Sequence, residues 1–252
     1  MITTAAGFNK RVLDKQFFSI NAEDNIFSQL NIVLTKLKPQ KNSLLKVILA
    51  SDFVRYLALP AHHISMSAVD KNAYATAAYR EVYGNVVDIW QVQCDDAAPN
   101  RTTIATAIDQ KLFTQLTAIA EKHSLKLASV QPQLMPIFNQ FKHELKTRDV
   151  YFCVIEANRL LFTHLKNGHW QSLRSLVLEA DWQSQLASLA KREQLLTESL
   201  VTENLINRQL MVYAPAEKSV TLPVIAGWMI KRIGHVAMST ADRHYITLEV
   251  AL

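Results

Sequence analysis

The 252-residue sequence predicts an α/β protein with mixed sheets, built as two lobes of related type. Short runs of β-branched and aromatic residues alternate with amphipathic helical segments along most of the chain. Near residue 150 this rhythm changes, and three strand-like runs follow one another through links short enough for hairpins. We therefore expect a first lobe over residues 1–145 and a second over 146–252, a length that gives each lobe its own core.

The first lobe opens with a mixed stretch, Val12–Ile20, that is compatible with a strand. A helix is predicted over Ala22–Leu37, with Asn21 as its cap and an apolar face that repeats every three to four residues. Two strand-like runs follow, Leu44–Leu49 and Phe53–Leu59. Both faces of the second run are largely apolar, which predicts a strand in the interior of a sheet.

The middle of the first lobe is expected to hold a small inserted subdomain at about residues 67–107. Ser67, followed three residues later by Asp70, predicts a capped helix that ends at Gly84. The insert then continues with two strands, Val86–Cys94 and Thr102–Ala107. The lobe is completed by a helix at Asp109–Lys122, a strand at Lys126–Val130 and a helix at Gln133–Leu145.

The second lobe is expected to begin with a three-stranded meander and to continue with two strand–helix–strand crossovers. This order is typical of the ribonuclease H-like fold, and two such lobes in tandem form the actin-like fold. The predicted strands are Tyr151–Glu156, Arg159–Leu165, His169–Leu176, Gln209–Tyr213 and Tyr245–Val250, and the predicted helices are Asp181–Thr197 and Pro223–Ile233.

Glycine is scarce, with five residues in the whole chain and no two of them closer than seven positions. Loops that bind phosphate need glycine so that backbone N–H groups can approach the anion. An ATP site between two actin-like lobes would need such a loop in each lobe. The corresponding segments, Leu49–Phe53 and Ile155–Leu160, contain no glycine, so we expect no nucleotide and no other cofactor.

Catalytic and metal sites are not predicted either. A two-metal nuclease centre needs three or four converging carboxylates, whereas Glu156 is expected to be a surface charge at a hairpin end and Glu249 is poorly placed. The adjacent His62 and His63 would point in opposite directions on an extended segment. His164 and His169 flank an Asn-Gly turn and could face each other across a hairpin, but they lack a third ligand. We therefore assign no catalytic and no metal residue.

The charge and cysteine content of the chain limit its possible partners and its cellular compartment. The net charge is +5, but the basic residues are spread over small groups, of which Lys142, Lys146 and Arg148 form one. Because no group is interleaved with aromatic residues, we expect a solvated surface and no nucleic-acid partner. Cys94 and Cys153 lie in strand-like runs and are expected to be buried free thiols. No segment has the length and apolar character of a membrane span or signal peptide, which predicts a cytoplasmic protein.

Residues 51–60 read SDFVRYLALP and suggest an interaction surface. Arg55 on this strand would need a carboxylate or carbonyl partner if it were inside the structure. We expect Arg55 and Tyr56 to be the residues that contact a binding partner, with a purely structural role as the alternative.

The run from Val47 to Pro60 resembles a stretch of the cytoplasmic actin-like proteins of type II secretion and type IV pilus assembly. In that family an apolar strand is followed by Ser-Asp and by a Val-Arg-Tyr-like strand that ends in proline. Further features follow in an order similar to that of the family: the pair Tyr83-Gly84 and the segments Ala107–Asp109 and Ser129–Pro132. The resemblance therefore covers about residues 44–180.

The resemblance, to PilM-like pilus proteins and L-component-like secretion proteins, implies a non-enzymatic scaffold or adaptor that docks protein partners in an assembly platform. Some members bind ATP and others are degenerate at that site, so a divergent ATPase or phosphotransferase is the alternative function. The implied location is cytoplasmic, at the inner face of the inner membrane through a partner and without direct membrane insertion. A homodimer is also compatible with the resemblance.

Overall fold

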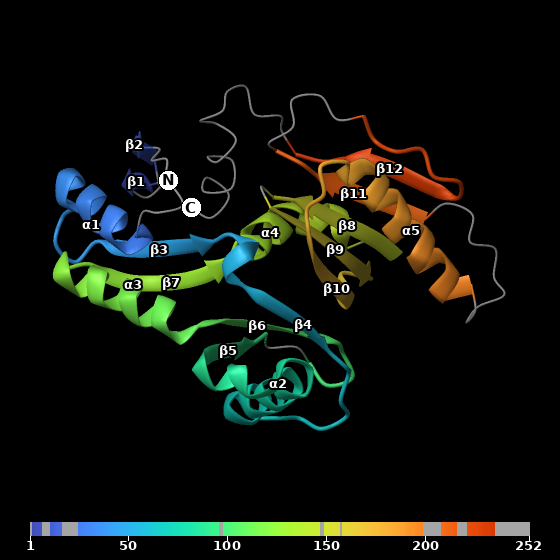
Figure 1. Ribbon diagram of the computed structural model, residues 1–252, viewed down its shortest axis with the longest axis horizontal. Helices are drawn as coiled ribbons and strands as arrows, with labels where there is room; N and C mark the ends of the chain where they lie inside the picture. The colour runs from blue at the N-terminus through green and yellow to red at the C-terminus, as the bar shows by residue number, and fades with distance from the viewer. Residues whose placement is uncertain are drawn as a thin grey trace.

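The computed structural model describes residues 2–6, 11–16, 25–95, 98–146, 149–156, 158–198, 208–215 and 221–234. Its first half holds three small sheets and its second half one larger sheet, as Figure 1 shows. Over the residues described, no helix combines the length and hydropathy that a membrane span requires.

The three sheets of the first half differ in strand direction. Strands β1 (Ile2–Ala6) and β2 (Arg11–Gln16) form an antiparallel pair. A parallel pair joins β3 (Leu44–Leu49) to β7 (Lys126–Pro132). The third sheet is antiparallel, in the order β4-β6-β5, and consists of β4 (Arg55–Leu59), β6 (Thr103–Asp109) and β5 (Trp90–Cys94).

Helices cover these sheets through small apolar clusters. Helices α1 (Ile26–Leu37) and α3 (Gln110–Lys122) pack beside β3 and β7 through residues that include Leu34 and Ile119. Helix α2 (Ala68–Tyr83) covers one face of the β4-β6-β5 sheet, where Ala75 and Tyr79 are fully buried. The Tyr79 hydroxyl donates to a backbone oxygen of β4 or β6, since those of Arg55 and Ala105 both lie within 3 Å.

The second half is built on one five-stranded sheet in the order β10-β9-β8-β11-β12. Helix α5 (Trp182–Glu198) covers one face and α4 (Leu134–Leu145) packs against the other. Strands β8, β9 and β10 form an antiparallel meander, and β8, β11 and β12 run parallel. The strands are β8 (Asp149–Ile155), β9 (Arg159–Lys166), β10 (His169–Val177), β11 (Arg208–Tyr213) and β12 (Trp228–Arg232).

Most predicted elements are confirmed within a few residues. They include the helix capped by Ser67, whose hydroxyl oxygen accepts from the Asp70 backbone N–H, and its end at Gly84. The three-stranded meander, the Asn-Gly turn and the long helix that follows are also confirmed. The boundary at residue 145 and the limits of the insert stay predictions. Strand β4, which precedes the predicted insert, pairs directly with β6, one of its two predicted strands.

Three predictions in the first half are wrong in detail. Helix α1 begins at Ile26 rather than Ala22, because the side chain of Asn25 accepts from the first backbone N–H groups. The predicted strand at Val86–Cys94 starts with a 3₁₀ turn at Gly84–Ile89. The run that begins at Phe53 also starts with a 3₁₀ turn, at Ser51–Phe53, and its strand β4 lies at a sheet edge instead of the interior.

The predicted helix at Pro223–Ile233 is wrong, because Trp228–Arg232 forms strand β12 beside β11. Trp228 and Ile230 pack towards α5 while Met229 and Lys231 are exposed, which is the two-residue alternation of a strand. A proline followed by a short apolar run fits both a helix start and a strand, so the pattern alone misled the assignment. The predicted strands at Val12–Ile20, in part, and Tyr245–Val250 lie outside the described residues.

Candidate functional site

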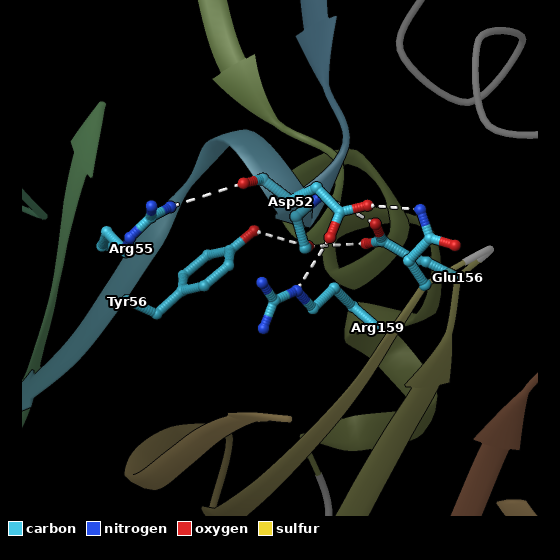
Figure 2. A network of polar contacts seen from close by, with 7 residues as sticks. Asp52, Arg55, Tyr56, Glu156 and Arg159 are labelled. Atoms are coloured by element: carbon cyan, nitrogen blue, oxygen red, sulfur yellow. Dashed lines mark hydrogen bonds and ion pairs between the residues drawn. The ribbon is translucent and has the colours of Figure 1, made fainter. Parts of the chain in front are cut away.

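A polar cluster joins the two halves where the turn after β3 meets the β8–β9 hairpin (Figure 2). The Ser51 backbone N–H donates to Glu156 Oε2 at 2.8 Å, and the Ser51 hydroxyl donates to Glu156 Oε1 at 2.7 Å. The Tyr56 hydroxyl lies 3.1 Å from Ser51 Oγ. Because Ser51 has one hydroxyl proton, which goes to Glu156, its oxygen accepts from Tyr56.

Asp52 forms the outer part of this cluster. Its two carboxylate oxygens accept from Arg159 Nε at 2.8 Å and from Asn158 Nδ2 at 2.9 Å. We call the six residues Ser51, Asp52, Tyr56, Glu156, Asn158 and Arg159 the clasp. Every one of these bonds except the Ser51–Tyr56 contact joins residues more than one hundred positions apart.

The inner part of the clasp is buried, and burial sets its electrostatics. Ser51 is 1% and Glu156 8% exposed. Burial raises the pKa of the Glu156 carboxyl, while the two bonds from Ser51 partly offset this rise. Burial likewise raises the pKa of the Tyr56 hydroxyl, which stays protonated and able to donate. The prediction that Glu156 is a surface charge is therefore wrong: it is an internal acceptor for a turn of the other half.

A groove of about 380 Å³ lies on the face of the β4-β6-β5 sheet opposite α2. Strand β5 contributes the polar side chains Gln91 and Gln93, and β7 contributes four consecutive residues, Ser129–Pro132. Since successive side chains of a strand point in opposite directions, four consecutive lining residues mean that β7 borders the groove with its backbone edge. Apolar residues fill in the remaining walls: Leu49, Ile104, Ile108, Phe113 and Met135.

A second cavity, of about 500 Å³, opens between the start of α1, the Ser51–Phe53 turn and the start of α3. It is lined by Arg55 and Trp90, with the Arg55 guanidinium 5.7 Å from the centre of the Trp90 indole ring. Neither of these two cavities is lined by a residue after Met135, so both belong to the first half of the chain.

The two residues predicted to bind a partner lie in different environments. Arg55 is exposed on β4, lines the larger cavity and makes a long 3.4 Å contact with the Asp52 backbone oxygen. Tyr56 points the other way and is only 7% exposed, as expected for neighbours on a strand. Arg55 is therefore accessible to a partner and Tyr56 is part of the interior, while their roles in partner binding stay predictions.

The two pairs of histidines considered as metal ligands have separate partners. His164 bonds to Asp149 and stacks on Tyr151, whereas His169 pairs with Lys166 in the strand register and contacts Arg101. His62 and His63 bond to different oxygens. In the part of the chain that the structure describes, no three metal-ligating side chains come together.

Cys153 is fully buried, as predicted, and burial raises the pKa of its thiol. Cys94 is only partly buried and lines the groove, so that half of the prediction is wrong. The groove itself was not predicted from the sequence. Its one sequence signal is the alternation in Trp90–Cys94, where the two glutamines occupy the face of β5 that α2 leaves uncovered.

No protein-family model and no curated protein matches the sequence. Solved structures do match the fold. A Bacteroides thetaiotaomicron protein of unknown function with an actin-like ATPase fold aligns with a TM-score of 0.57 at 11% identity, over 81% of this chain and 74% of that chain. The fold is actin-like.

The cytoplasmic domain of EpsL, an inner-membrane component of the Vibrio cholerae type II secretion system, also aligns with a TM-score of 0.57. The identity is 10%, and the alignment covers 99% of this chain and 87% of that domain. A PilM–PilN type IV pilus biogenesis complex aligns less well, with a TM-score of 0.49 at 11% identity over 74% of this chain and 67% of that one. The first two of these structures confirm the actin-like fold that the sequence resemblance implies.

The two segments that an ATP site between actin-like lobes would need as its phosphate-binding loops, Leu49–Phe53 and Ile155–Leu160, meet in the clasp. They touch directly, each carries a carboxylate, Asp52 or Glu156, and neither contains glycine. A phosphate group at this position would meet two acidic side chains and lose the approach of backbone N–H groups. The arrangement joins the two halves and is poorly suited to hold a nucleotide.

Proposed function

We propose that this protein is a non-enzymatic actin-like adaptor in a pilus or secretion assembly platform. It binds an extended segment of a partner protein in the groove between β5 and β7. The observation that carries the proposal is the strand edge of β7, which pairs with β3 on one side and borders the groove on the other.

A free strand edge is a ready receptor for an extended chain. A peptide that pairs with β7 gains main-chain hydrogen bonds, while its alternate side chains enter pockets on either side. The lining of this groove offers amide groups from Gln91, Gln93 and Gln131 and apolar surface from Phe113 and Met135, with one carboxylate at Asp95. The groove therefore favours a segment in which polar and apolar residues alternate.

The clasp supports a role without nucleotide. Its buried bonds hold the Ser51–Phe53 turn in place, and this turn connects β3, which pairs with β7, to β4, which belongs to the sheet beneath the groove. The same bonds place two carboxylates at the junction. The proposal assigns the junction a structural role and the groove the binding role.

The setting in an assembly platform rests on the sequence resemblance together with the likeness to the EpsL cytoplasmic domain, which extends over nearly the whole chain. Both lines lead to proteins that work at the inner face of the inner membrane. We therefore expect the partner to be the cytoplasmic segment of an inner-membrane component of such a platform.

A pairwise interaction assay tests this function directly. The full chain is screened in a bacterial two-hybrid format against each membrane component of the pilus and secretion platforms of its own source organism. The variant Gln93→Arg places a long charged side chain in the groove, and Gln40→Arg, an exposed position after α1, is the matched control. We expect one component to bind, with at least tenfold less signal for Gln93→Arg and an unchanged signal for Gln40→Arg.

Two results would contradict the proposal in different ways. If no component binds the wild-type chain, the assignment to an assembly platform is wrong. If a component binds and Gln93→Arg leaves the signal unchanged, the platform assignment stands and the groove is not the docking site.

A further inference from the structure

Positive charge gathers around the tip of the β9–β10 hairpin. Lys166 and His169 are cross-strand neighbours at this tip, which turns through Asn167 and Gly168 with positive φ angles of 53° and 76°. The Arg101 guanidinium lies 3.1 Å from His169 Nδ1 and donates to it. The tip therefore brings a lysine of the second half beside an arginine of the first.

The end of α4 adds two more lysines to this surface. The side chain of Lys146 packs against the turn so closely that a Cβ built on Gly168 would lie 3.0 Å from Lys146 Cγ. Lys142 precedes Lys146 by four residues, so the two side chains share one face of the helix. We call Arg101, Lys142, Lys146 and Lys166 the cationic tip, and all four are exposed.

Acidic groups beside the tip offset only part of this charge. Asp149 is the strand neighbour of Lys166, and the bond from His164 and, to a smaller extent, the charge of Lys166 lower the pKa of its carboxyl. Glu144 is two residues from each lysine of α4, which puts its side chain on a different side of the helix. Over the described residues of these segments, four cations therefore stand against the carboxylates of Asp149 and Glu144, which leaves a net positive charge.

We propose that the cationic tip associates with the phosphate groups of an anionic phospholipid bilayer. The four exposed cations come from three separate segments that meet at this turn, so several side chains can contact a negatively charged surface at once. Trp170, the tryptophan of this hairpin tip, is 7% exposed and cannot offer its ring face to a nucleobase. Because the described hairpin β9–β10 exposes no Phe, Tyr or Trp ring, phospholipid is favoured over single-stranded nucleic acid.

Association of this kind is electrostatic and contributes about 1 kcal/mol for each lysine or arginine at the membrane surface. It needs no membrane-spanning helix, and salt should weaken it because the charges stay in water. It would hold the second half of the chain against the bilayer independently of the partner groove, so its test does not depend on the proposed adaptor function.

Vesicle co-sedimentation tests the proposal with the full chain. The probes are vesicles of phosphatidylcholine alone and vesicles with one third phosphatidylglycerol, at about 50 and 300 mM salt. The triple variant Lys142→Gln, Lys146→Gln, Lys166→Gln keeps the aliphatic stems and removes three charges. The control, Lys36→Gln, Lys122→Gln, Lys191→Gln, removes three charges from exposed positions on α1, α3 and α5.

We expect the wild type and the control to bind the anionic vesicles at low salt and neither to bind phosphatidylcholine. The tip variant should lose roughly a hundredfold in partitioning, from three lysines at the contribution above. Unchanged thermal unfolding of both variants confirms that each is folded. An equal loss in both variants would mean that net charge alone drives binding. Absence of vesicle binding by the wild type, or tight binding to single-stranded RNA in its place, would overturn the proposal.

Discussion

The two halves of the chain place similar elements around very different interiors. In the second half a single five-stranded sheet lies between α4 and α5, and residues such as Phe152, Leu161 and Leu186 have no exposed surface. In the first half three small sheets are spread over a longer stretch of chain, and two cavities open between them. The second half is thus a closed core, whereas the first half leaves edges and grooves that a partner can use.

This contrast explains where each function can lie. A packed interior resists rearrangement because every side chain already has its contacts. Strand edges and gaps between small sheets cost the first half stability, and they are also the features that receive an extended peptide. The clasp connects the two, since the buried Glu156 of the second half fixes a turn of the first.

The largest effect is expected from a truncation in the closed core. Phe152→Ala removes a ring that is fully buried and lies edge-on to Phe141, and should lower the free energy of unfolding by about 3–5 kcal/mol. Phe113→Ala removes a half-buried ring that lines the groove and should cost much less. Denaturant unfolding of both variants measures the difference in unfolding free energy. Equal losses would show that the two halves are packed equally tightly.

A smaller loss is expected from the clasp. Glu156→Ala leaves the N–H and hydroxyl of Ser51 buried without their acceptor, which should cost about 1–3 kcal/mol of unfolding free energy. A double-mutant cycle with Ser51→Ala isolates the contact, because the two changes should be clearly less than additive. Fully additive losses would show that the two residues do not act together in solution.

The pH dependence of the clasp follows from the raised pKa of Glu156. In the folded state its carboxyl binds a proton more tightly than in the unfolded chain, so stability falls as pH rises from the ordinary value of about 4.3 through the raised pKa. Glu156→Gln cannot titrate. The wild type should therefore gain stability relative to this variant as pH is lowered through that window, measured by unfolding at matched pH values. A difference that does not change with pH would contradict the burial of the carboxyl.

The smallest effect on stability is expected from labelling the two cysteines, which report how open each half is. Cys94, at the end of β5, is only partly buried and should react with a maleimide in the native protein, while the fully buried Cys153 should react only after unfolding. Mass spectrometry of the native protein should find one label, with little change in the unfolding temperature. Two labels under native conditions would show that the second half opens as readily as the first.

The sequence predicted the local elements well because their signals are local. The cap at Ser67, the stop at Gly84 and the Asn167-Gly168 turn each depend on a few neighbouring residues. It failed where distant contacts decide. Glu156 looks like a hairpin-end charge until the turn at Ser51, 105 residues earlier, is brought against it. The strand at Trp228 was mistaken for a helix because its partner β11 is not visible in a short apolar run.

The candidate site was predictable only in part. The two segments compared with phosphate-binding loops, around Ser51 and Glu156, contact each other, although that contact was not predicted, and Arg55 lines a cavity. The groove could not be foreseen, because it arises from the spacing between two sheets whose strands are far apart in sequence. Only the alternation of Gln91 and Gln93 in β5 gave a local hint of a strand face left without cover.

Thermal unfolding with and without millimolar Mg-ATP tests whether the junction is a structural clasp that holds no nucleotide. A ligand that binds the native state at a hundred times its Kd adds about 2.7 kcal/mol of stability. For a chain of this size the unfolding temperature would then rise by roughly 5–10 °C. We predict no shift. A rise of that size, abolished by Ser51→Ala, would contradict the account and indicate a nucleotide site at the junction.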